Sequence, residues 1–265
     1  MIHPSAIIHP RAKLDSTVRV GPFAVIDEGV ELGPHCLVGP HVYLAGLTTI
    51  GANNRFHAGC VIGDAPQDLK YKNEPTRLRI GSDNVFREHV TAHRSTRPET
   101  ETVIGSHNFL MANAHVAHNC VVGDHVIMAN STMLGGYAVV QDRAFLSGNC
   151  LVHQFARVGT LALMQGGAAI SQDLPPFAIS KRINEMCGLN VIGLRRAGFT
   201  PEQRSELKRL YHRLFRSGEN LPVALAAARQ EFSSAPAKIL LDFVAEAKRG
   251  VCADLGRAEA GHQED

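Results

Sequence analysis

The chain has 265 residues, of which 45% are hydrophobic and 20% charged, a composition typical of an ordinary soluble globular protein. Its formal net charge of +2 at pH 7 gives no reason to expect nucleic acid as a partner. No stretch approaches the roughly 18 consecutive apolar residues of a membrane span, so we expect no membrane insertion.

The N-terminal segment MIHPSAIIHPRAK has proline and histidine where a secretory signal would have an uninterrupted apolar run. We therefore expect a cytoplasmic protein. Its six cysteines are then expected to be thiols, because that compartment is reducing.

An apolar residue recurs at every sixth position through most of the first 170 residues. The series, with two gaps, is Ile2, Ile8, Leu14, Val20, Ile26, Leu32, Val38, Leu44, Ile50, Phe56, Ile62, Ile80, Phe86, Ile104, Leu110, Val116, Val122, Met128, Leu134, Val140, Leu146, Val152, Val158, Met164 and Ile170. A period of six fits neither a helix of 3.6 residues per turn nor long alternating strands. It predicts a solenoid of very short strands, with one large and one small side chain pointing inward per six residues.

Four cysteines occupy the small inward position of this repeat and are expected to pack in the core, namely Cys36, Cys60, Cys120 and Cys150. The repeat resembles that of the hexapeptide-repeat proteins, which fold as a left-handed parallel β-helix. The resemblance implies three hexapeptides per triangular coil, so that residues 18 apart stack on neighbouring coils. We expect this mainly β fold over residues 1–180.

Two polar segments, Asp64 to Arg79 and Arg94 to Val103, break the repeat. Long loops in a compact repeat are usually functional. We therefore expect both loops to contribute to the function of the protein.

The character of the chain changes after residue 170, where the proline-rich segment SQDLPPFAIS marks the end of the solenoid. We expect a connecting segment over 181–198, an α-helical domain over 199–250 and a flexible tail over 251–265. Within the helical domain, Thr200 and Gln203 have the spacing of a helix-capping box. The segments NLPVALAAARQEF and SAPAKILLDFVAEAKR predict two further helices.

Five motifs carry a more specific resemblance: PQDLKY (Pro66–Tyr71), NAHVAHNC (Asn113–Cys120), VHQF (Val152–Phe155), QDLPPF (Gln172–Phe177) and GLNVIGLRRAGF (Gly188–Phe199). With the repeat and the helical C-terminus, they resemble the UDP-N-acetylglucosamine O-acyltransferases of lipid A biosynthesis. The resemblance implies transfer of a hydroxyacyl chain to the sugar 3-hydroxyl. The donor would be a thioester on the phosphopantetheine of acyl carrier protein. No metal or other cofactor is implied, and the active sites would lie between the subunits of a homotrimer.

The resemblance makes His118 the general base and the Gly136 N–H the oxyanion donor. Stacking at 18 supports this independently, because it places His118, Gly136 and Gln154 in one column. Base catalysis of acyl transfer to a hydroxyl needs such a pair of groups.

The remaining site residues come from the resemblance alone. Substrate contacts are expected from Asp68, Lys70, His115, Tyr137, His153, Gln154, Gly166, Asn190 and Arg196. Of these, Asn190 and Arg196 would contact the nucleotide phosphates. Gly166 would lie at the floor of the acyl pocket, where glycine favours a longer hydroxyacyl chain.

A metal site at His115, His118 and Cys120 is a weaker interpretation of the same motif. In a β-helix Cys120 points inward whereas His118 lies on the outer surface, so the three cannot converge on tetrahedral zinc. A nucleophilic Cys120 fails as well, since buried apolar thiols are inert.

The chain departs from the family pattern at Asn119, Tyr137, Ile192 and Ala197. Asn119 stands where aspartate is common, and we expect it to orient the imidazole of His118. The departures cluster around the sugar nucleotide and leave open a 3-amino sugar acceptor, hence an N-acyltransferase. A related enzyme that uses acetyl-CoA and a non-enzymatic β-helix binding module are further alternatives.

From Arg195 to Arg216 there are seven Lys or Arg residues and two Asp or Glu residues. This excess of positive charge favours a docking surface for the acidic acyl carrier protein. An ordinary solvated helix face is the alternative.

Overall fold

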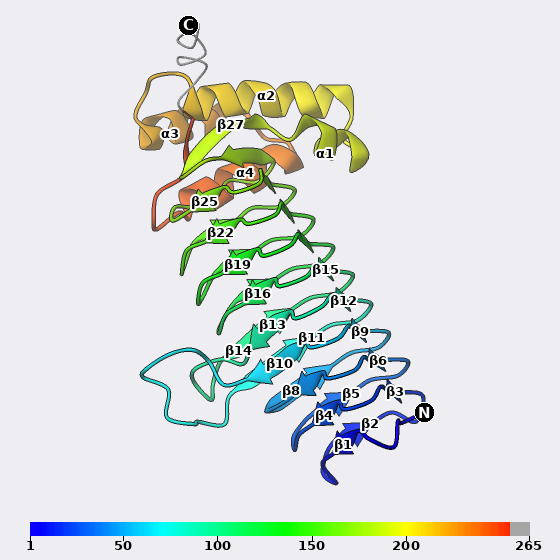
Figure 1. Cartoon of the computed structure of the whole chain (residues 1–265). Coiled ribbons are helices and arrows are strands. Elements are labelled where there is room, and N and C mark those ends of the chain that lie inside the picture. The colour runs from blue at the N-terminus through cyan, green and yellow to red at the C-terminus, as the bar shows by residue number, and fades with distance from the viewer. Residues whose placement is uncertain (255–265) are drawn as a thin grey trace, which may run out of the picture.

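The computed structural model describes residues 1–254, which form a solenoid of stacked coils with helices at its C-terminal end (Figure 1). The strands line up in three sheets, one along each side of the coil. All neighbouring strands are parallel except in one hairpin at the C-terminal end of the solenoid. The solenoid of short strands expected from the six-residue period is confirmed, as is the left-handed parallel β-helix that the resemblance implies.

The strands are short, and we number the sheets in the order in which the chain enters them. Sheet 1 contains β1 (Ile7–Ile8), β4 (Val25–Ile26), β7 (Tyr43–Leu44), β10 (Val61–Asp64), β13 (Thr91–His93), β16 (His115–Val116), β19 (Met133–Leu134), β22 (Leu151–Val152) and β25 (Ala169–Ile170). Sheet 2 contains β2 (Lys13–Leu14), β5 (Glu31–Leu32), β8 (Leu47–Ile50), β11 (Arg77–Ile80), β14 (Glu101–Ile104), β17 (Val121–Val122), β20 (Val139–Val140) and β23 (Arg157–Val158). Sheet 3 contains β3 (Arg19–Val20), β6 (Leu37–Val38), β9 (Arg55–Phe56), β12 (Val85–Phe86), β15 (Phe109–Leu110), β18 (Ile127–Met128), β21 (Phe145–Leu146), β24 (Leu163–Met164), β26 (Ala178–Lys181), β27 (Glu185–Leu189) and β28 (Ala253–Asp254).

The register of the sheets confirms the 18-residue coil. His115 pairs with Met133, which in turn pairs with Leu151. Where a loop leaves the solenoid the spacing grows, so that Val61 pairs with Thr91 and Thr91 pairs with His115. Each loop is therefore added to a coil without disturbing the stack above or below it.

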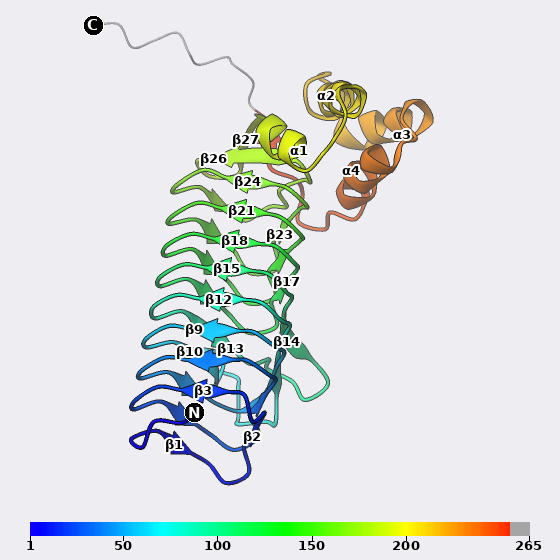
Figure 2. The same cartoon turned by 90° about the vertical axis from the view of Figure 1, so that its right-hand side faces the viewer.

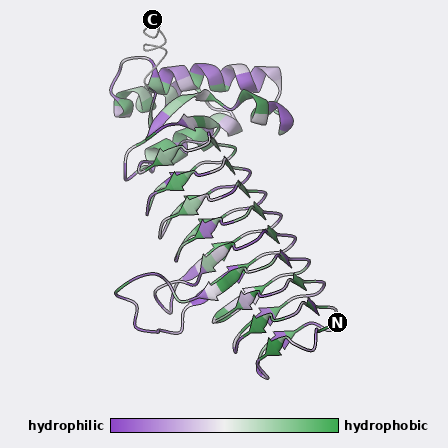
Figure 3. Cartoon of the chain, in the orientation of Figure 1, coloured by the Kyte–Doolittle hydropathy of each residue, from purple (hydrophilic) through white to green (hydrophobic). Residues whose placement is uncertain are grey.

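The core is a continuous column of mostly aliphatic side chains inside the coils, with Phe56 and Phe86 stacked on each other within it. Figure 3 shows the apolar residues concentrated along the strands of the solenoid. The cysteines are free thiols, and those at the small inward position are buried. For example, the Cys36 Sγ donates a hydrogen bond to the Gly51 carbonyl at 3.1 Å. Ile2 is an exception to the pattern, with 53% of its surface exposed, because the first coil has no coil beneath it.

Both loops are shorter than the sequence pattern predicts, at residues 65–76 and 94–100. Asp64 extends β10 by pairing with His93 after a bulge, and Arg77 begins β11. Glu101 begins β14, since it pairs with Arg77. The first loop projects far from the solenoid in Figure 1.

The prediction of a connecting segment over 181–198 is wrong, because much of this segment belongs to sheet 3 and to a helix. β26 pairs in parallel with β24, and β27 returns antiparallel to it, so the hairpin extends sheet 3 beyond the last coil. Helix α1 (Val191–Arg196) follows directly.

Three more helices complete the C-terminal end: α2 (Pro201–Phe215), α3 (Leu221–Glu231) and α4 (Ala235–Ala245). Figure 2 shows them gathered to one side of the solenoid. The predicted capping box at the start of α2 is confirmed, with Thr200 and Gln203 bonded to each other's backbone. Within residues 1–254 no helix combines the length and apolar character needed to cross a membrane.

The prediction of a tail from residue 251 is wrong for its first four residues. Ala253 and Asp254 form β28, which pairs with β27, and Cys252 is 1% exposed. Backbone hydrogen bonds hold the segment, since the Cys252 N–H donates to the Asp173 carbonyl. The rest of the predicted tail, 255–265, lies outside the described residues.

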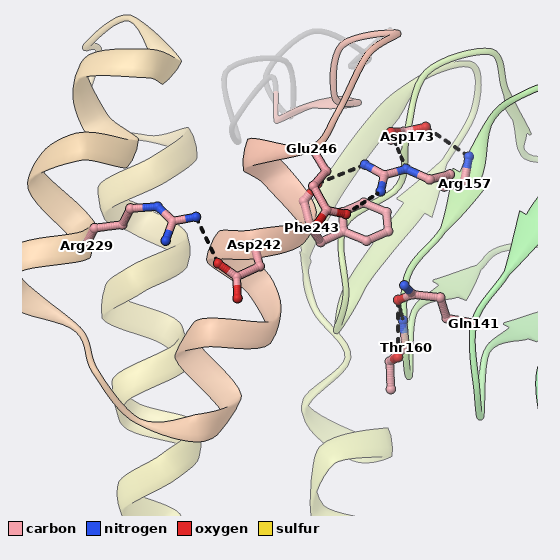
Figure 4. Close-up of polar contacts among 8 residues, drawn as sticks. All are labelled: Gln141, Arg157, Thr160, Asp173, Arg229, Asp242, Phe243 and Glu246. Atoms are coloured by element: carbon pink, nitrogen blue, oxygen red, sulfur yellow. Dashed lines mark hydrogen bonds and ion pairs between the residues drawn. The ribbon is translucent and has the colours of Figure 1, made fainter.

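Arg157 joins the solenoid to the helices (Figure 4). Its Nε donates to the Asp173 carboxylate at 2.8 Å, and its Nη2 donates to the Phe243 carbonyl at 2.9 Å. The guanidinium also lies 4.2 Å from the centre of the Phe243 ring. Because Asp173 is on the solenoid side and Phe243 is in α4, this single side chain fixes one part to the other.

Candidate active site

An open cavity of about 600 Å³ lies on the outer face of sheet 1, over β16, β19, β22 and β25. Its lining residues are Gln67, His115, Ala117, His118, Met133, Leu134, Gly135, Gly136, Leu151, Val152, His153, Gln154, Ala169, Ile170, Ser171 and Ile183. Polar groups gather at the corner that carries His118. Toward sheet 1 the exposed side chains are apolar, with Met133 and Leu151 each 47% exposed and Ile183 75% exposed.

His118 lies at the corner that follows β16, and its ring rests directly on Gly136 of the next coil. A Cβ added to Gly136 would lie 2.5 Å from the His118 Cε1 and 2.7 Å from its Nε2. Only glycine leaves room for the imidazole, since both distances are well below van der Waals contact. The backbone N–H of Gly136 has no hydrogen-bond partner among residues 1–254 and remains available.

The three corners stack as the sequence spacing predicts. The Tyr137 N–H donates to the His118 carbonyl at 3.0 Å, and the Phe155 N–H donates to the Gly136 carbonyl at 3.1 Å. Gln154 is exposed at the third corner and lines the same cavity.

Asn119 holds the other side of the His118 ring. Its Oδ1 is 3.0 Å from the His118 Nδ1 and also accepts hydrogen bonds from the Thr96 N–H and hydroxyl, at 3.1 and 2.9 Å. Its Nδ2 donates to the Thr100 hydroxyl at 2.8 Å. Asn119 is 7% exposed, so these contacts form in a largely dry environment.

Tyr137 packs against His118 rather than lining the cavity. Its ring meets the His118 ring edge-on at 5.5 Å and stacks on Phe155 at 4.9 Å. Its hydroxyl is 3.1 Å from the Thr96 Oγ1. The predicted substrate contact of Tyr137 is therefore untested, whereas its contact with His118 is plain.

His115 lines the cavity next to a second, unpredicted histidine. The His115 Nδ1 is 2.7 Å from the Thr91 hydroxyl, and the His93 ring meets His115 edge-on at 5.1 Å. Burial lowers the pKa of His115 to about 4 and also lowers the pKa of His93. Both rings are thus held neutral beside His118.

His153 is exposed at the cavity, and its Nδ1 lies 3.1 Å from the Gln154 carbonyl. Cys120, by contrast, points into the core, where its Sγ donates to the Gly135 carbonyl at 3.2 Å. Burial raises the pKa of its thiol to about 12. The inward orientation of Cys120 expected from the repeat is confirmed, and it separates the thiol from both histidines of the motif.

Two predicted residues on the first loop do not reach the cavity of their own chain. Asp68 accepts a hydrogen bond from the Lys70 N–H at 2.9 Å, and the Lys70 side chain is exposed. Their neighbour Gln67 lines the cavity instead. Leu69, at the loop tip, is fully exposed.

Three further predicted residues also lie apart from His118. Gly166 is at a different corner, against the Gly148 carbonyl, and Arg196 is exposed at the end of α1. Asn190 is 8% exposed and caps α1, with its Oδ1 accepting from the Gly193 N–H. Its Nδ2 donates to the Leu161 carbonyl, so the structure accounts for this side chain as a helix cap.

Several residues of the site were not predicted: Gln67, His93, Thr96, Thr100, Met133, Leu151 and Ile183. Met133 and Leu151 occupy outward positions, where the repeat places no constraint on residue type, and Ile183 lies between β26 and β27, beyond the repeat. The threonines lie in the second loop, whose length was the only sign of a role.

A family model described as "Udp N-acetylglucosamine O-acyltransferase; Domain 2" matches residues 173–252. A second, "Bacterial transferase hexapeptide (six repeats)", matches residues 101–136. Fold and site together define an enzyme of the hexapeptide-repeat acyltransferase class.

Comparison with curated relatives identifies the family within this class of acyltransferases. An acyl-(acyl-carrier-protein)–UDP-N-acetylglucosamine O-acyltransferase of Syntrophobacter fumaroxidans is 44% identical, over 94% of this chain and 98% of its own length. That of Trichlorobacter lovleyi is 48% identical over 95% and 98%. The chain belongs to the family of acyl carrier protein-dependent UDP-N-acetylglucosamine O-acyltransferases.

Solved structures agree with the sequence relatives. The UDP-N-acetylglucosamine acyltransferase of Francisella novicida superimposes with a TM-score of 0.93 at 32% identity, over the whole of both chains. The Bacteroides fragilis enzyme gives a TM-score of 0.91 at 38% identity, over 95% of this chain and 99% of that one.

Proposed function

We propose that this enzyme transfers a 3-hydroxyacyl chain from acyl carrier protein to the 3-hydroxyl of UDP-N-acetylglucosamine, the first step of lipid A biosynthesis. The names of its relatives support the two substrates. The observation that carries the proposal is that the His118 ring packs directly against Gly136, beside an apolar surface.

In the proposed reaction the His118 Nε2 takes the proton of the sugar 3-hydroxyl as that oxygen attacks the thioester carbon. The new C–O bond leaves negative charge on the former carbonyl oxygen, where the Gly136 N–H can donate a hydrogen bond. When the C–S bond breaks, the imidazolium returns its proton to the leaving thiolate. The protein's own side chains thus account for every proton that moves.

The acyl chain is proposed to lie along the exposed side chains of Met133, Leu151 and Ile183. Burying these apolar groups against a hydrocarbon chain removes both from water, at about 25 cal/mol per Å². The reacting thioester would then lie next to His118, at the polar end of the same cavity.

Acyl carrier protein is proposed to dock on the basic face of α1 and α2. Some cations on this face are already paired within the chain and are less available to acyl carrier protein. Arg213 pairs with Glu219 and Arg216 with Asp254, whereas Arg195, Arg196 and Lys208 are exposed. Charge reversal at these last three should raise the KM for the acyl carrier thioester and leave the KM for the sugar nucleotide unchanged. An unchanged carrier KM would rule out this surface.

A homotrimer is proposed because one chain leaves the site incomplete. Asp68, Lys70, Gly166 and Arg196 are expected substrate contacts, yet none lines the cavity that contains His118. In a cyclic trimer, loops and corners of a neighbouring subunit can complete the cavity.

Replacing the base tests the function directly. His118→Gln should lower kcat by about 10²–10⁴-fold, the usual contribution of a general base, without changing the fold. His107→Gln is a matched control, because His107 stacks on His125 at an outer corner and does not line the cavity. Normal turnover by a folded His118→Gln variant would rule out the mechanism and leave a binding module as the better interpretation.

A 3-amino sugar remains the second candidate acceptor, because the neutral Asn119 amide contacts the base. An amine is a stronger nucleophile than a hydroxyl and depends less on its base. Turnover with both acceptors, each with acyl carrier thioesters and with acetyl-CoA, would identify acceptor and donor. A clear preference for UDP-N-acetylglucosamine would exclude the amino sugar.

A further inference from the structure

We propose that the second loop, residues 94–100, is a positioning element that determines which ring nitrogen of His118 carries the proton. Thr96 and Thr100 of this loop lock the side-chain amide of Asn119 in one orientation, and Asn119 in turn selects one tautomer of the base. The proposal rests on the role of His118 given above, and it assigns a task to a loop that contributes no lining residue to the cavity.

The orientation of the Asn119 amide follows from hydrogen bonding alone. The Thr96 backbone N–H can only donate, so the atom 3.1 Å from it must be the amide oxygen. On the other side, the Thr100 hydroxyl donates its hydrogen to the Arg97 carbonyl at 2.9 Å. It therefore accepts from the Asn119 Nδ2 at 2.8 Å. A flipped amide would place its NH₂ group against the Thr96 N–H, donor against donor, and its oxygen against the Thr100 hydroxyl oxygen, which already donates to Arg97.

The amide orientation decides where the His118 proton resides. The Asn119 Oδ1 carries no hydrogen, so the His118 Nδ1 at 3.0 Å must be the donor. A neutral imidazole has one N–H, and the lone pair is then on Nε2. That is the nitrogen next to Gly136, where the substrate hydroxyl is expected.

Tyr137 extends the same chain of hydrogen bonds. The single hydroxyl hydrogen of Thr96 goes to the Asn119 Oδ1 at 2.9 Å, so the Tyr137 hydroxyl must donate to the Thr96 Oγ1 at 3.1 Å. Tyr137 also braces the His118 ring edge-on. The other titratable groups facing His118 are His93 and His115, which burial holds neutral.

A purely structural role for the threonines would have different consequences. If they only tied the loop to the solenoid, their removal would lower stability and leave the His118 proton in place. The tautomer of His118 therefore separates the two roles, and it can be read without any substrate.

The experiment is nitrogen NMR of the enzyme labelled with ¹⁵N-histidine, with the His118 signals assigned by their loss in His118→Gln. The wild type, at a pH where His118 is neutral, should show hydrogen on Nδ1. The double variant Thr96→Val and Thr100→Val keeps the side-chain shapes and removes both hydroxyl contacts to the Asn119 amide, leaving only the Thr96 N–H. It should raise the share of hydrogen on Nε2 and lower kcat, by up to about tenfold. Thr96→Ser, with the hydroxyl retained, should behave as wild type.

Thr48→Val is the matched control, since it removes a buried hydroxyl that bonds to the Ala45 carbonyl, remote from the cavity. It should leave the tautomer and kcat unchanged. Hydrogen on Nε2 in the wild type would overturn the proposal, as would an unchanged tautomer in the double variant. A locked tautomer combined with an active His118→Gln variant would instead refute the base mechanism alone.

Discussion

Asn119 adopts the left-handed backbone conformation, with a φ of +59°, at the corner that carries His118, the proposed base. Asparagine and aspartate tolerate this region better than other residues with side chains. Its Oδ1 receives three donors, from Thr96 and His118, which is more than a neutral oxygen usually accepts. This corner would therefore accommodate a carboxylate as well as the amide it contains.

Asn119→Asp should consequently fold and remain active, with an altered pH profile. A negative charge about 3 Å from the imidazole favours its protonated form, so the base would lose its proton at higher pH. We expect the acidic limb of kcat/KM to move up by about one pH unit. The Thr100 hydroxyl can turn to donate to the new oxygen.

Asn149→Asp is a suitable comparison, because Asn149 is exposed at another corner with a φ of +58°. It should leave the profile in place. An unchanged acidic limb in Asn119→Asp would mean that this side chain does not influence the base.

His115 should make the folded state sensitive to mild acid. Burial lowers its pKa to about 4, against about 6.5 in the unfolded chain, so only the unfolded chain takes up the proton between these values. Stability is therefore complete above pH 6.5 and falls as the pH drops toward 4, by about 3 kcal/mol in all.

Urea unfolding at several pH values measures this slope. His115→Gln should flatten it, and the remainder should reflect His93, whose pKa burial also lowers. A slope that is the same in wild type and His115→Gln would contradict the assignment, whatever the offset in stability between the two proteins.

Residue-scale prediction from the sequence succeeded where the repeat phase determines direction. The six-residue phase placed Cys120 inward, and the 18-residue coil implied by the resemblance stacked His118 on Gly136. The phase said nothing about Thr96, because a side chain in a loop has no fixed phase. Asn190 was assigned from a resemblance, and its capping hydrogen bonds were not visible in the sequence.

At the scale of elements, two arginine–aspartate pairs of equal length differ in environment (Figure 4). Arg157 and Asp173 are 2.8 Å apart, with side chains 20% and 2% exposed. Arg229 and Asp242 are also 2.8 Å apart, but 45% and 59% exposed. The equal distances alone would predict equal contributions to stability, whereas the difference in desolvation predicts unequal ones.

Arg157→Gln should therefore lower the free energy of unfolding by about 3 kcal/mol, because it leaves the Asp173 carboxylate buried with fewer partners. Arg229→Gln should lower it by less than about 1 kcal/mol. Urea denaturation of both variants checks the difference, and equal losses would show that burial does not control these pairs.

The elements themselves were predictable to different degrees. Long periodic series and a capping box located the solenoid and α2, because both depend on local spacing. The β26–β27 hairpin and β28 were missed, since neither continues the six-residue period. β28 in particular is held by contacts to Asp173 and to β27, far away in the sequence.

At the scale of the whole molecule, the incomplete cavity predicts complementation between chains. His118→Ala and Lys70→Ala should each be nearly inactive alone. If Lys70 acts in the site of a neighbouring subunit, co-refolding equal amounts should restore about a quarter of wild-type activity, the share of sites with both residues intact.

Two kinds of result bear on this prediction. A mass in solution near three times the chain mass of 28.7 kDa supports the trimer. A monomeric mass would exclude it, and no recovery in the mixture would place Lys70 in the same chain's site or outside it.

The 18-residue coil has one consequence for how such an enzyme can change over evolution. His118, Gly136 and Gln154 occupy the same phase in three consecutive coils. Their separation along the solenoid axis can therefore only be a whole number of strand spacings of about 4.8 Å. A one-residue deletion between them would turn every later side chain to another face, whereas insertion of a full coil would preserve all directions and lengthen the site by one step. Gradual adjustment of the site is consequently confined to side chains and loops.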